Sequence, residues 1–467
     1  MIQWTIFFIY FGLVSLIAIL SYHRQKNATD YILGSRGLNF WLTALSAHAS
    51  DMSSWLFLAY PAEIFQQGVF YAWAAIGLTL FMFLNWQFIA PRIRALSEQL
   101  GSLTLNSYFE ERYADTSGAI RVVSAIMAVL FYTIYITSGL YAMGLLVESL
   151  LGLDYIIGVF SGLLLVVLYV FMGGYTTVAW IDLFQGFFLL GIILFIPSWF
   201  LFQAGGTAPI LDAVAAKKLS TSLFPDFQLT TLWQITMVAA GWGLGYFGQP
   251  HIITKFMGIR SVGEINKAKW LGISWQSTAL IAATWVGLSG IYLFPGGIKE
   301  TQELILNIVK THFPAFFSEL VLCAILAATT NVMAAQLLVM ASNMSEDLYK
   351  RIFRPMASQK EQLWATRGSV LLVALIAFWI AYFKITTIFE LVLYAWSGLG
   401  ASFGPLLLLS LYSQKINRQG AFAGILVGGL TGALWPLTGN PWGIGAMVAG
   451  FAASITAIYT VSFFTRD

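Results

Sequence analysis

The sequence predicts an all-α polytopic membrane protein, on three observations. Hydrophobic residues make up 58% of the 467 positions, charged residues make up 10%, and the mean hydropathy is +0.78. A single water-soluble core could not bury so much apolar surface. The apolar residues also fall into runs of spanning length, and the basic residues gather in alternate loops, as they do in membrane proteins with many crossings.

Thirteen apolar segments are long enough to span a bilayer as helices. The first lacks the basic start and the small-residue cleavage site of a signal peptide, so we predict that it remains as a transmembrane helix. The segments cover residues 2–22, 38–58, 68–90, 119–149, 153–171, 176–203, 229–255, 268–295, 315–345, 365–383, 389–411, 420–437 and 441–464.

Lysine and arginine are spread unevenly over the loops between these segments. If the N-terminus lies outside, nineteen of them, Lys255 included, fall on the inner side and five on the outer side. Because basic residues accumulate in cytoplasmic loops, the sequence predicts a protein of the cell inner (plasma) membrane with its N-terminus outside and its C-terminus in the cytoplasm. The outer set is Lys217, Lys218, Lys299, Lys310 and Lys384.

The second apolar segment contains an unusual polar stretch, Ala44–Trp55, with the sequence ALSAHASDMSSW. A carboxylate at bilayer depth is costly, so Asp51 should face protein or water and mark a substrate or ion pathway. The serines around it could bond to backbone groups that a locally unwound helix sets free. A continuous helix with serines bonded to its own carbonyls is the alternative, but it leaves Asp51 without a partner. We therefore predict a broken helix.

A second interruption lies in the seventh segment, at Gly241–Pro250, where GWGLGYFGQP holds four glycines and a proline. This helix should break as well. The two broken segments each open a set of five spans, and an odd number makes the second set begin on the opposite side of the membrane. That arrangement is an inverted repeat, with the binding site at the midplane between the breaks.

The predicted organisation therefore has five parts. They are an N-terminal helix with the first cytoplasmic loop (1–37), a first repeat (38–203), an extracellular connector (204–228), a second repeat (229–411) and two C-terminal transmembrane helices (412–467).

Other polar residues at membrane depth add to the candidate site. Asp182, in the sixth segment, needs a cation, an ion pair or a proton. Trp242 and Tyr246 are four residues apart among glycines that let a ligand approach the backbone, so they are candidates for a binding wall. Two charged stretches, 105–113 and 345–350, are predicted to form short cytoplasmic helices, which we interpret as solvated connectors.

The sequence lacks a phosphate-binding loop, a metal-spaced His/Cys cluster and a nucleophile–base pair. The chain is therefore not expected to be an enzyme or to carry an organic cofactor. Its expected partners are a small solute and the lipid bilayer, and no pattern points to nucleic acid or to a protein partner.

Several motifs, in order along nearly the whole chain, resemble the sodium/solute symporter family and most of all its bacterial sodium/proline symporters. The resemblance implies the leucine-transporter fold, with thirteen helices and a five-plus-five inverted core, and cation-driven symport by alternating access. The motifs are DYILGSRGL, ALSAHASDMSSW, TIYITSG, GWGLGYFGQPH, AILAATTNVMAAQLLV, SEDLYK and LYAWSGLGASFGP.

The resemblance also implies roles for individual residues. A sodium ion would be bound by the backbone carbonyls of Ala49, Met52 and Ala328. Asp51 and Ser53 match positions that handle sodium and proline, and Asp182 matches a carboxylate near a second cation position. The positions that match the surroundings of bound proline are Tyr135, Trp242, Tyr246 and Pro250.

One departure from the family pattern concerns the coupling ion. The family supplies two adjacent hydroxyl groups to sodium, and the matching positions here are Asn331 and Val332. The amide oxygen of Asn331 could bind sodium, but the isopropyl group of Val332 could not. Coupling to sodium is thus the implied function. Coupling to protons through Asp182 or Asp51, or uncoupled transport, is the alternative, and a solute-binding sensor is the third.

Overall fold

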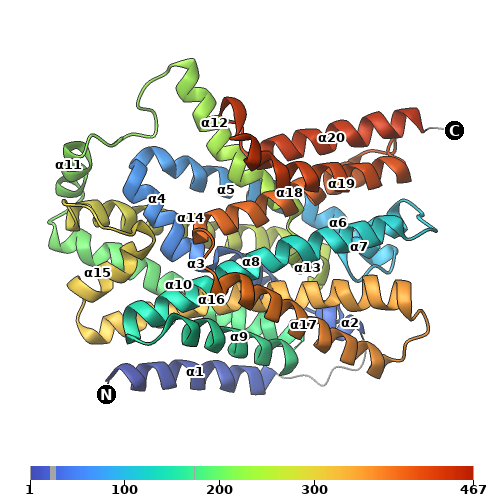
Figure 1. The fold of residues 1–467 in the computed structure, drawn as a ribbon, viewed down its shortest axis with the longest axis horizontal. Coiled ribbons are helices and arrows are strands. Elements are labelled where there is room, and N and C mark those ends of the chain that lie inside the picture. The colour runs from blue at the N-terminus through green and yellow to red at the C-terminus, as the bar shows by residue number, and fades with distance from the viewer. Residues whose placement is uncertain (1, 22–27, 173, 466–467) are drawn as a thin grey trace.

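The computed structural model describes residues 2–21, 28–172 and 174–465, and in those ranges the chain is nearly all helix, with two isolated bridges and no strand. Figure 1 shows the long helices lying side by side in one bundle. Each predicted apolar segment overlaps a helix. The all-α prediction is therefore confirmed.

The helices that overlap the predicted segments differ in length and regularity. They are α1 (Ile2–Ser21), α3 (Phe40–Ser54) with α4 (Tyr60–Gln67), α5 (Trp73–Leu84) with α6 (Ala90–Gln99), α8 (Ala119–Leu151), α9 (Tyr155–Met172), α10 (Tyr175–Gln203), α12 (Leu229–Gly243) with α13 (Pro250–Gly258), α14 (Ile265–Leu293), α16 (Ala315–Ser342), α17 (Gln359–Tyr382), α18 (Ile388–Tyr412), α19 (Arg418–Leu434) and α20 (Ala446–Phe464).

Four short helices lie between them: α2 (Ala28–Leu33), α7 (Leu105–Arg112), α11 (Ala208–Ala216) and α15 (Leu304–His312). Within the described ranges, eight helical stretches are long and apolar enough to cross a membrane, and two apolar helical stretches are shorter. The count of thirteen crossings stays a prediction.

Both predicted helix breaks are confirmed. In α3, Ser53 has φ +46° and ψ −167°, far from helical values, and the π-helical stretch η2 (Trp55–Ala59) leads into α4. The second break follows α12, where the 3₁₀ stretch η5 (Leu244–Gly248) ends in an extended Gln249 before α13 begins. The positive φ of a non-glycine residue is an uncommon conformation and is typical of a functional site.

The two broken helices run in opposite directions. At one end, the backbone of Leu38, just before α3, bonds to Gly258 and Arg260 at the end of α13, at 3.3 and 2.7 Å. At the other end, Val69, just after α4, donates to the carbonyl of Ser220 at 2.8 Å, in the segment that leads to α12. An inverted repeat requires this antiparallel arrangement. The domain boundaries themselves stay a prediction.

Small residues let the helices approach closely. A Cβ added at Gly77 in α5 would lie 2.3 Å from the carbonyl oxygen of Ala239 in α12, and one at Gly428 in α19 would lie 2.2 Å from that of Ala401 in α18. Close backbone packing of this kind stabilises helix pairs in lipid, where there is little hydrophobic drive between helices. Packing of this kind also holds α18 against the second break, where a Cβ added at Gly248 would lie 2.6 Å from the backbone nitrogen of Gly404.

The orientation can be tested with single cysteines at the exposed residues Thr207 and Ser358. We expect an impermeant thiol reagent to label Thr207→Cys in intact cells, and Ser358→Cys only after the membrane is permeabilised, because the charge pattern predicts that the basic loops face the cytoplasm. The native Cys323 is buried, so the unmodified protein is the control. Labelling of Ser358→Cys from outside would reverse the orientation.

Candidate functional site

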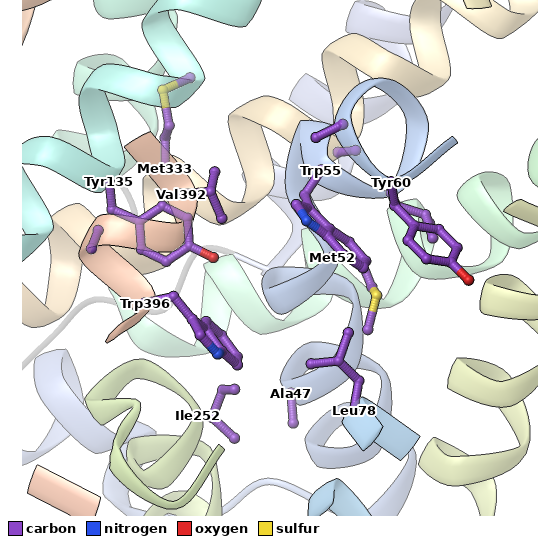
Figure 2. Packing of buried hydrophobic residues seen from close by; sticks show 14 of the residues in the cluster. Ala47, Met52, Trp55, Tyr60, Leu78, Tyr135, Ile252, Met333, Val392 and Trp396 are labelled. Carbon is purple, nitrogen blue, oxygen red and sulfur yellow. The ribbon is translucent and has the colours of Figure 1, made fainter. Parts of the chain in front are cut away.

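A small cavity lies where the two helix breaks meet. Its volume is about 20 Å³, room for little more than a water molecule. Figure 2 shows Tyr135 and Trp396 on one side of this space and Met52 and Trp55 on the other. An amino acid could enter only if these side chains moved apart. The lining residues are Asp51, Met52, Trp55, Leu78, Tyr135, Trp242, Tyr246, Val392 and Trp396.

Asp51 connects the two breaks across this cavity. The hydroxyl of Tyr246, in η5, donates a hydrogen bond to Oδ2 of Asp51, in α3. The other carboxylate oxygen, Oδ1, has no hydrogen-bond partner within the described ranges, and Asp51 forms no ion pair there. A buried carboxylate with one open oxygen is suited to bind a cation or a ligand amino group.

Aromatic rings close the cavity on one side. The ring of Trp242 lies 5.0 Å from that of Trp55 and 5.6 Å from that of Phe389, and the indole nitrogen of Trp242 donates to the hydroxyl of Tyr71 at 3.1 Å. Phe389 also lines a much larger cavity of about 940 Å³, together with Glu63 and other residues of the α4, η7 (Thr301–Glu303) and α18 region. The aromatic layer thus separates the small cavity from a wide vestibule.

Five of the predicted site residues line the small cavity: Asp51, Met52, Tyr135, Trp242 and Tyr246. The sequence reasoning missed Trp55, Leu78, Val392 and Trp396. Two of these residues lie in motifs described above: Trp55 ends the first polar stretch, and Trp396 lies in LYAWSGLGASFGP. A tryptophan next to serine and glycine in an apolar segment was the available signal.

Two predicted substrate residues lie outside the cavity lining. The hydroxyl oxygen of Ser53 accepts a bond from the backbone N–H of Trp55 at 3.1 Å, so it stabilises the break itself. Pro250 begins α13 and lines a separate cavity of about 10 Å³ with Thr104 and Asn343. Tyr246 and Pro250 therefore line different cavities.

Asp182 forms an ion pair with a residue of the same chain. Its Oδ2 accepts hydrogen bonds from the hydroxyl of Ser46 and from the ammonium group of Lys255, the latter at 3.1 Å. Both charged side chains are buried, at 1% and 3% exposure, and the ammonium lies 4.9 Å from the ring centre of Tyr175. The charge count had placed Lys255 among the basic residues of the inner side. The structure instead puts it inside α13, where the carboxylate compensates its charge.

The predicted sodium ligands lie on two helices that pack together, with Ala49 and Met52 on α3 and Ala328 and Asn331 on α16. Asn331 is 2% exposed, and neither its amide nitrogen nor its oxygen has a hydrogen-bond partner in the described part of the chain. An unsatisfied buried amide is costly and is suited to a bound ion or water. That these four residues bind a cation stays a prediction.

The two threonines before Asn331 are less available to bind a cation, because their hydroxyls are already hydrogen-bonded. The hydroxyls of Thr329 and Thr330 donate to the carbonyls of Ile325 and Leu326 in their own helix, at 2.7 and 2.8 Å. Such bonds satisfy a hydroxyl within α16. Of these residues, only Asn331 has a side-chain oxygen available to take the place of the missing hydroxyl ligand.

Three acidic residues of the two charged stretches, Glu110, Glu346 and Asp347, are buried, and our interpretation of these stretches as solvated connectors was wrong. Stretch 105–113 forms α7, and stretch 345–350 lies in the π-helical η8 (Asn343–Phe353). Asp347 accepts bonds from Thr104, Asn106 and Arg121 at 3.0, 2.9 and 2.6 Å. Arg121 also pairs with Glu110 at 3.0 Å. Because each charge is paired, the network can pack as a buried layer at the predicted cytoplasmic end.

Comparisons with known proteins agree with one another. The sequence model of the sodium:solute symporter family matches residues 31–428. The chain is 39% identical over 456 residues to the high-affinity proline transporter PutP of Bacillus subtilis (strain 168), covering 97% of this chain and 96% of that one. It is 37% identical over 451 residues to the sodium/proline symporter of Escherichia coli (strain K12), covering 94% and 88%.

Among solved structures, the chain resembles the substrate-bound, outward-open state of a Na⁺-coupled sialic acid symporter. The TM-score is 0.85 at 18% sequence identity, over 100% of this chain and 98% of that one. This likeness shows the fold, which is the leucine-transporter fold expected from the sequence.

The Asp182–Lys255 pair can be tested by stability. Lys255→Gln should leave a buried carboxylate without a cation and lower the free energy of unfolding by roughly 3–5 kcal/mol, because removing one partner of a buried pair exposes the desolvation penalty of the other. Thermal unfolding of the detergent-purified protein measures this change. The double variant Asp182→Asn with Lys255→Gln should recover most of the loss. Full stability of Lys255→Gln alone would contradict the pairing.

Proposed function

The chain belongs to the sodium:solute symporter family, and from that premise we propose that it is a secondary active transporter for proline or a similar small amino acid. Uptake would be coupled to a cation and proceed by alternating access between the two sides of the membrane. The names of the two bacterial relatives, a proline transporter and a sodium/proline symporter, support this substrate.

The observation that carries the proposal is the carboxylate of Asp51 at the cavity between the breaks. Its Oδ1 atom is buried without a hydrogen-bond partner in the described ranges, so it is available to a cation or to the amino group of an amino acid. The cavity walls are mostly aromatic and apolar, which suits a compact apolar ring such as that of proline. Sugars would need several polar partners that these walls do not offer.

Sodium is the coupling ion that the family favours. It would be bound by the carbonyls of Ala49, Met52 and Ala328 and by the side-chain oxygen of Asn331, which is unpartnered within the described ranges. Hard cations such as sodium prefer oxygen ligands, and fewer ligands give weaker binding. Because Val332 contributes no oxygen, we propose that sodium binds more weakly here than at a site with two hydroxyls.

Proton coupling remains the second candidate, and Asp51 is the residue that favours it. Burial of a carboxylate without an ion pair can be balanced by a proton as well as by a metal cation. Asp182 is less suited to this role because Lys255 already balances its charge.

The proposed orientation has the N-terminus outside and the C-terminus in the cytoplasm. In Figure 1, α1 begins at the end of the bundle where α11 and α15 lie, and α20 ends at the opposite end. This placement supports an odd number of crossings. The wide vestibule opens among the η7 and α17–α18 segments, which the charge pattern assigns to the outside.

Transport by purified protein in liposomes tests the function. We expect labelled proline to accumulate under an inward sodium gradient and to be displaced by excess unlabelled proline, but not by glucose, sialic acid or pantothenate. A proton gradient imposed without sodium tests the second candidate. If a sugar displaced the label while unlabelled proline did not, the substrate would be wrong.

Restoring the missing hydroxyls tests the sodium site. We expect Asn331→Ser with Val332→Thr to lower the half-saturating sodium concentration by about tenfold, the effect of roughly 1.4 kcal/mol of added binding energy. Thr330→Ala is the matched control and should leave sodium dependence unchanged, because that hydroxyl is bonded within its own helix. Steep, saturable sodium dependence in the unmodified protein, unchanged by the double substitution, would show that Asn331 already completes the site.

A further inference from the structure

Gln276 lies directly behind the candidate site. It belongs to α14, is fully buried and is not among the residues that line the cavity. Its amide nitrogen, Nε2, donates a hydrogen bond to the hydroxyl oxygen of Tyr246 at 3.1 Å. Tyr246 in turn donates to Asp51. A chain of two hydrogen bonds thus leads from an unbroken helix to the carboxylate at the first break.

The chemistry of these groups fixes the direction of both bonds. An amide N–H can only donate, and a phenol has one proton to give. When Gln276 donates to the oxygen of Tyr246, the single proton of Tyr246 is free to point at Asp51. An acceptor at the position of Nε2 would compete with Asp51 for that proton. A donor at residue 276 therefore favours the bond from Tyr246 to Asp51, and an acceptor there would weaken it.

The position of Tyr246 is secured without Gln276. Asn85 donates to the backbone carbonyl of Tyr246 at 2.9 Å, and the ring of Trp396 lies edge-on to the Tyr246 ring at 5.2 Å. These contacts hold the backbone and the ring, but neither touches the hydroxyl group. The loss of Gln276 should therefore change the direction of the O–H bond and leave the ring in place.

Close packing between α14 and α3 fixes the position of Gln276 along α3. Gly272, one turn earlier in α14, packs so closely on His48 of α3 that an added Cβ would lie 2.2 Å from Nε2 of that ring. The ring of His48 is in turn fixed by Trp86, whose indole nitrogen donates to it at 3.0 Å. The amide of Gln276 thus keeps a constant relation to the helix that carries Asp51.

We propose that Gln276 is a positioning residue that keeps Tyr246 donating to Oδ2 of Asp51, so that Oδ1 is the oxygen presented to the ligand or coupling ion. This inference rests on the proposed function, because it assigns Gln276 a part in binding at Asp51. It predicts an effect on ligand affinity, whereas a purely structural role predicts an effect on folding alone.

The first experiment compares Gln276→Met and Gln276→Glu with the unmodified full-length protein in liposomes. Met keeps the length of the side chain but cannot donate, and ionised Glu can only accept. We expect Gln276→Met to raise the KM for proline by about 3- to 10-fold with little change in maximal rate, the range for one buried hydrogen bond, and Gln276→Glu to raise it further. An unchanged KM in both variants would overturn the inference.

Gln185→Met is the matched control. Gln185 is also fully buried, and its Nε2 donates to the hydroxyl of Tyr10 at 2.7 Å, but this pair joins α10 to α1. The substitution should cost similar stability and leave the KM for proline unchanged. An equal rise in KM in this control would mean that the effect of Gln276→Met is a general effect of losing a buried glutamine, and would overturn the inference.

A double-mutant cycle isolates the pathway. If Gln276 acts only through the hydroxyl of Tyr246, then Gln276→Met should have no further effect on KM once Tyr246→Phe has removed that hydroxyl. Effects that multiply in the combined variant would show that Gln276 acts by another route.

An infrared measurement tests the bond direction without transport. The phenolic C–O stretch of labelled tyrosine differs between a hydroxyl that donates and one that also accepts. We expect Gln276→Met to shift one tyrosine band, and the shift to vanish in the Tyr246→Phe background. Absence of a shift would overturn the inference even if no proline transport were found, whereas failure of proline uptake by the unmodified protein would reject the proposed function alone.

Discussion

The hydrogen bond between Asp51 and Tyr246 joins the two places where transmembrane helices are interrupted, and the surrounding structure is arranged to make those interruptions possible. A broken helix exposes backbone carbonyls that lipid cannot satisfy. Here the indole of Trp396 donates to the carbonyl of Trp242 at 2.8 Å, and Asn85 donates to that of Tyr246. Protein groups thus satisfy two of the carbonyls at the second break.

The two carboxylates of this region illustrate two ways to bury a charge. Asp182 is balanced from within by the ammonium group of Lys255 and accepts a bond from Ser46, although its Oδ1, like that of Asp51, has no partner in the described ranges. Asp51 has only the neutral Tyr246 hydroxyl and an open oxygen. Because an uncompensated charge at membrane depth is expensive, the second arrangement favours an exchangeable cation. This difference between the two sites supports the proposal that Asp182 is structural and that Asp51 takes part in transport.

The sequence predicted the structure correctly where the evidence lay within one short stretch of residues. Hydropathy predicted the helices, and four glycines with a proline predicted the second break; an aspartate among serines predicted the first. Prediction from the sequence failed where the burial of a charged residue depends on a partner that is distant in the chain. Lys255 meets Asp182 across 73 positions and Arg121 meets Asp347 across 226, so neither burial could be read from charge spacing alone. Pro250 was assigned to the proline site through the family resemblance; it lines a separate small cavity, and its role stays a prediction.

We propose that Asp51, and not Asp182, is the buried negative charge that the coupling cation must balance during transport. Transient currents from protein adsorbed on a solid-supported membrane, triggered by a jump in proline concentration, measure the movement of charge directly. We expect a cation-dependent current in the unmodified protein and in the double variant Asp182→Asn with Lys255→Gln. We expect no such current in Asp51→Asn. A current that persists in Asp51→Asn and disappears in the double variant would contradict the proposal.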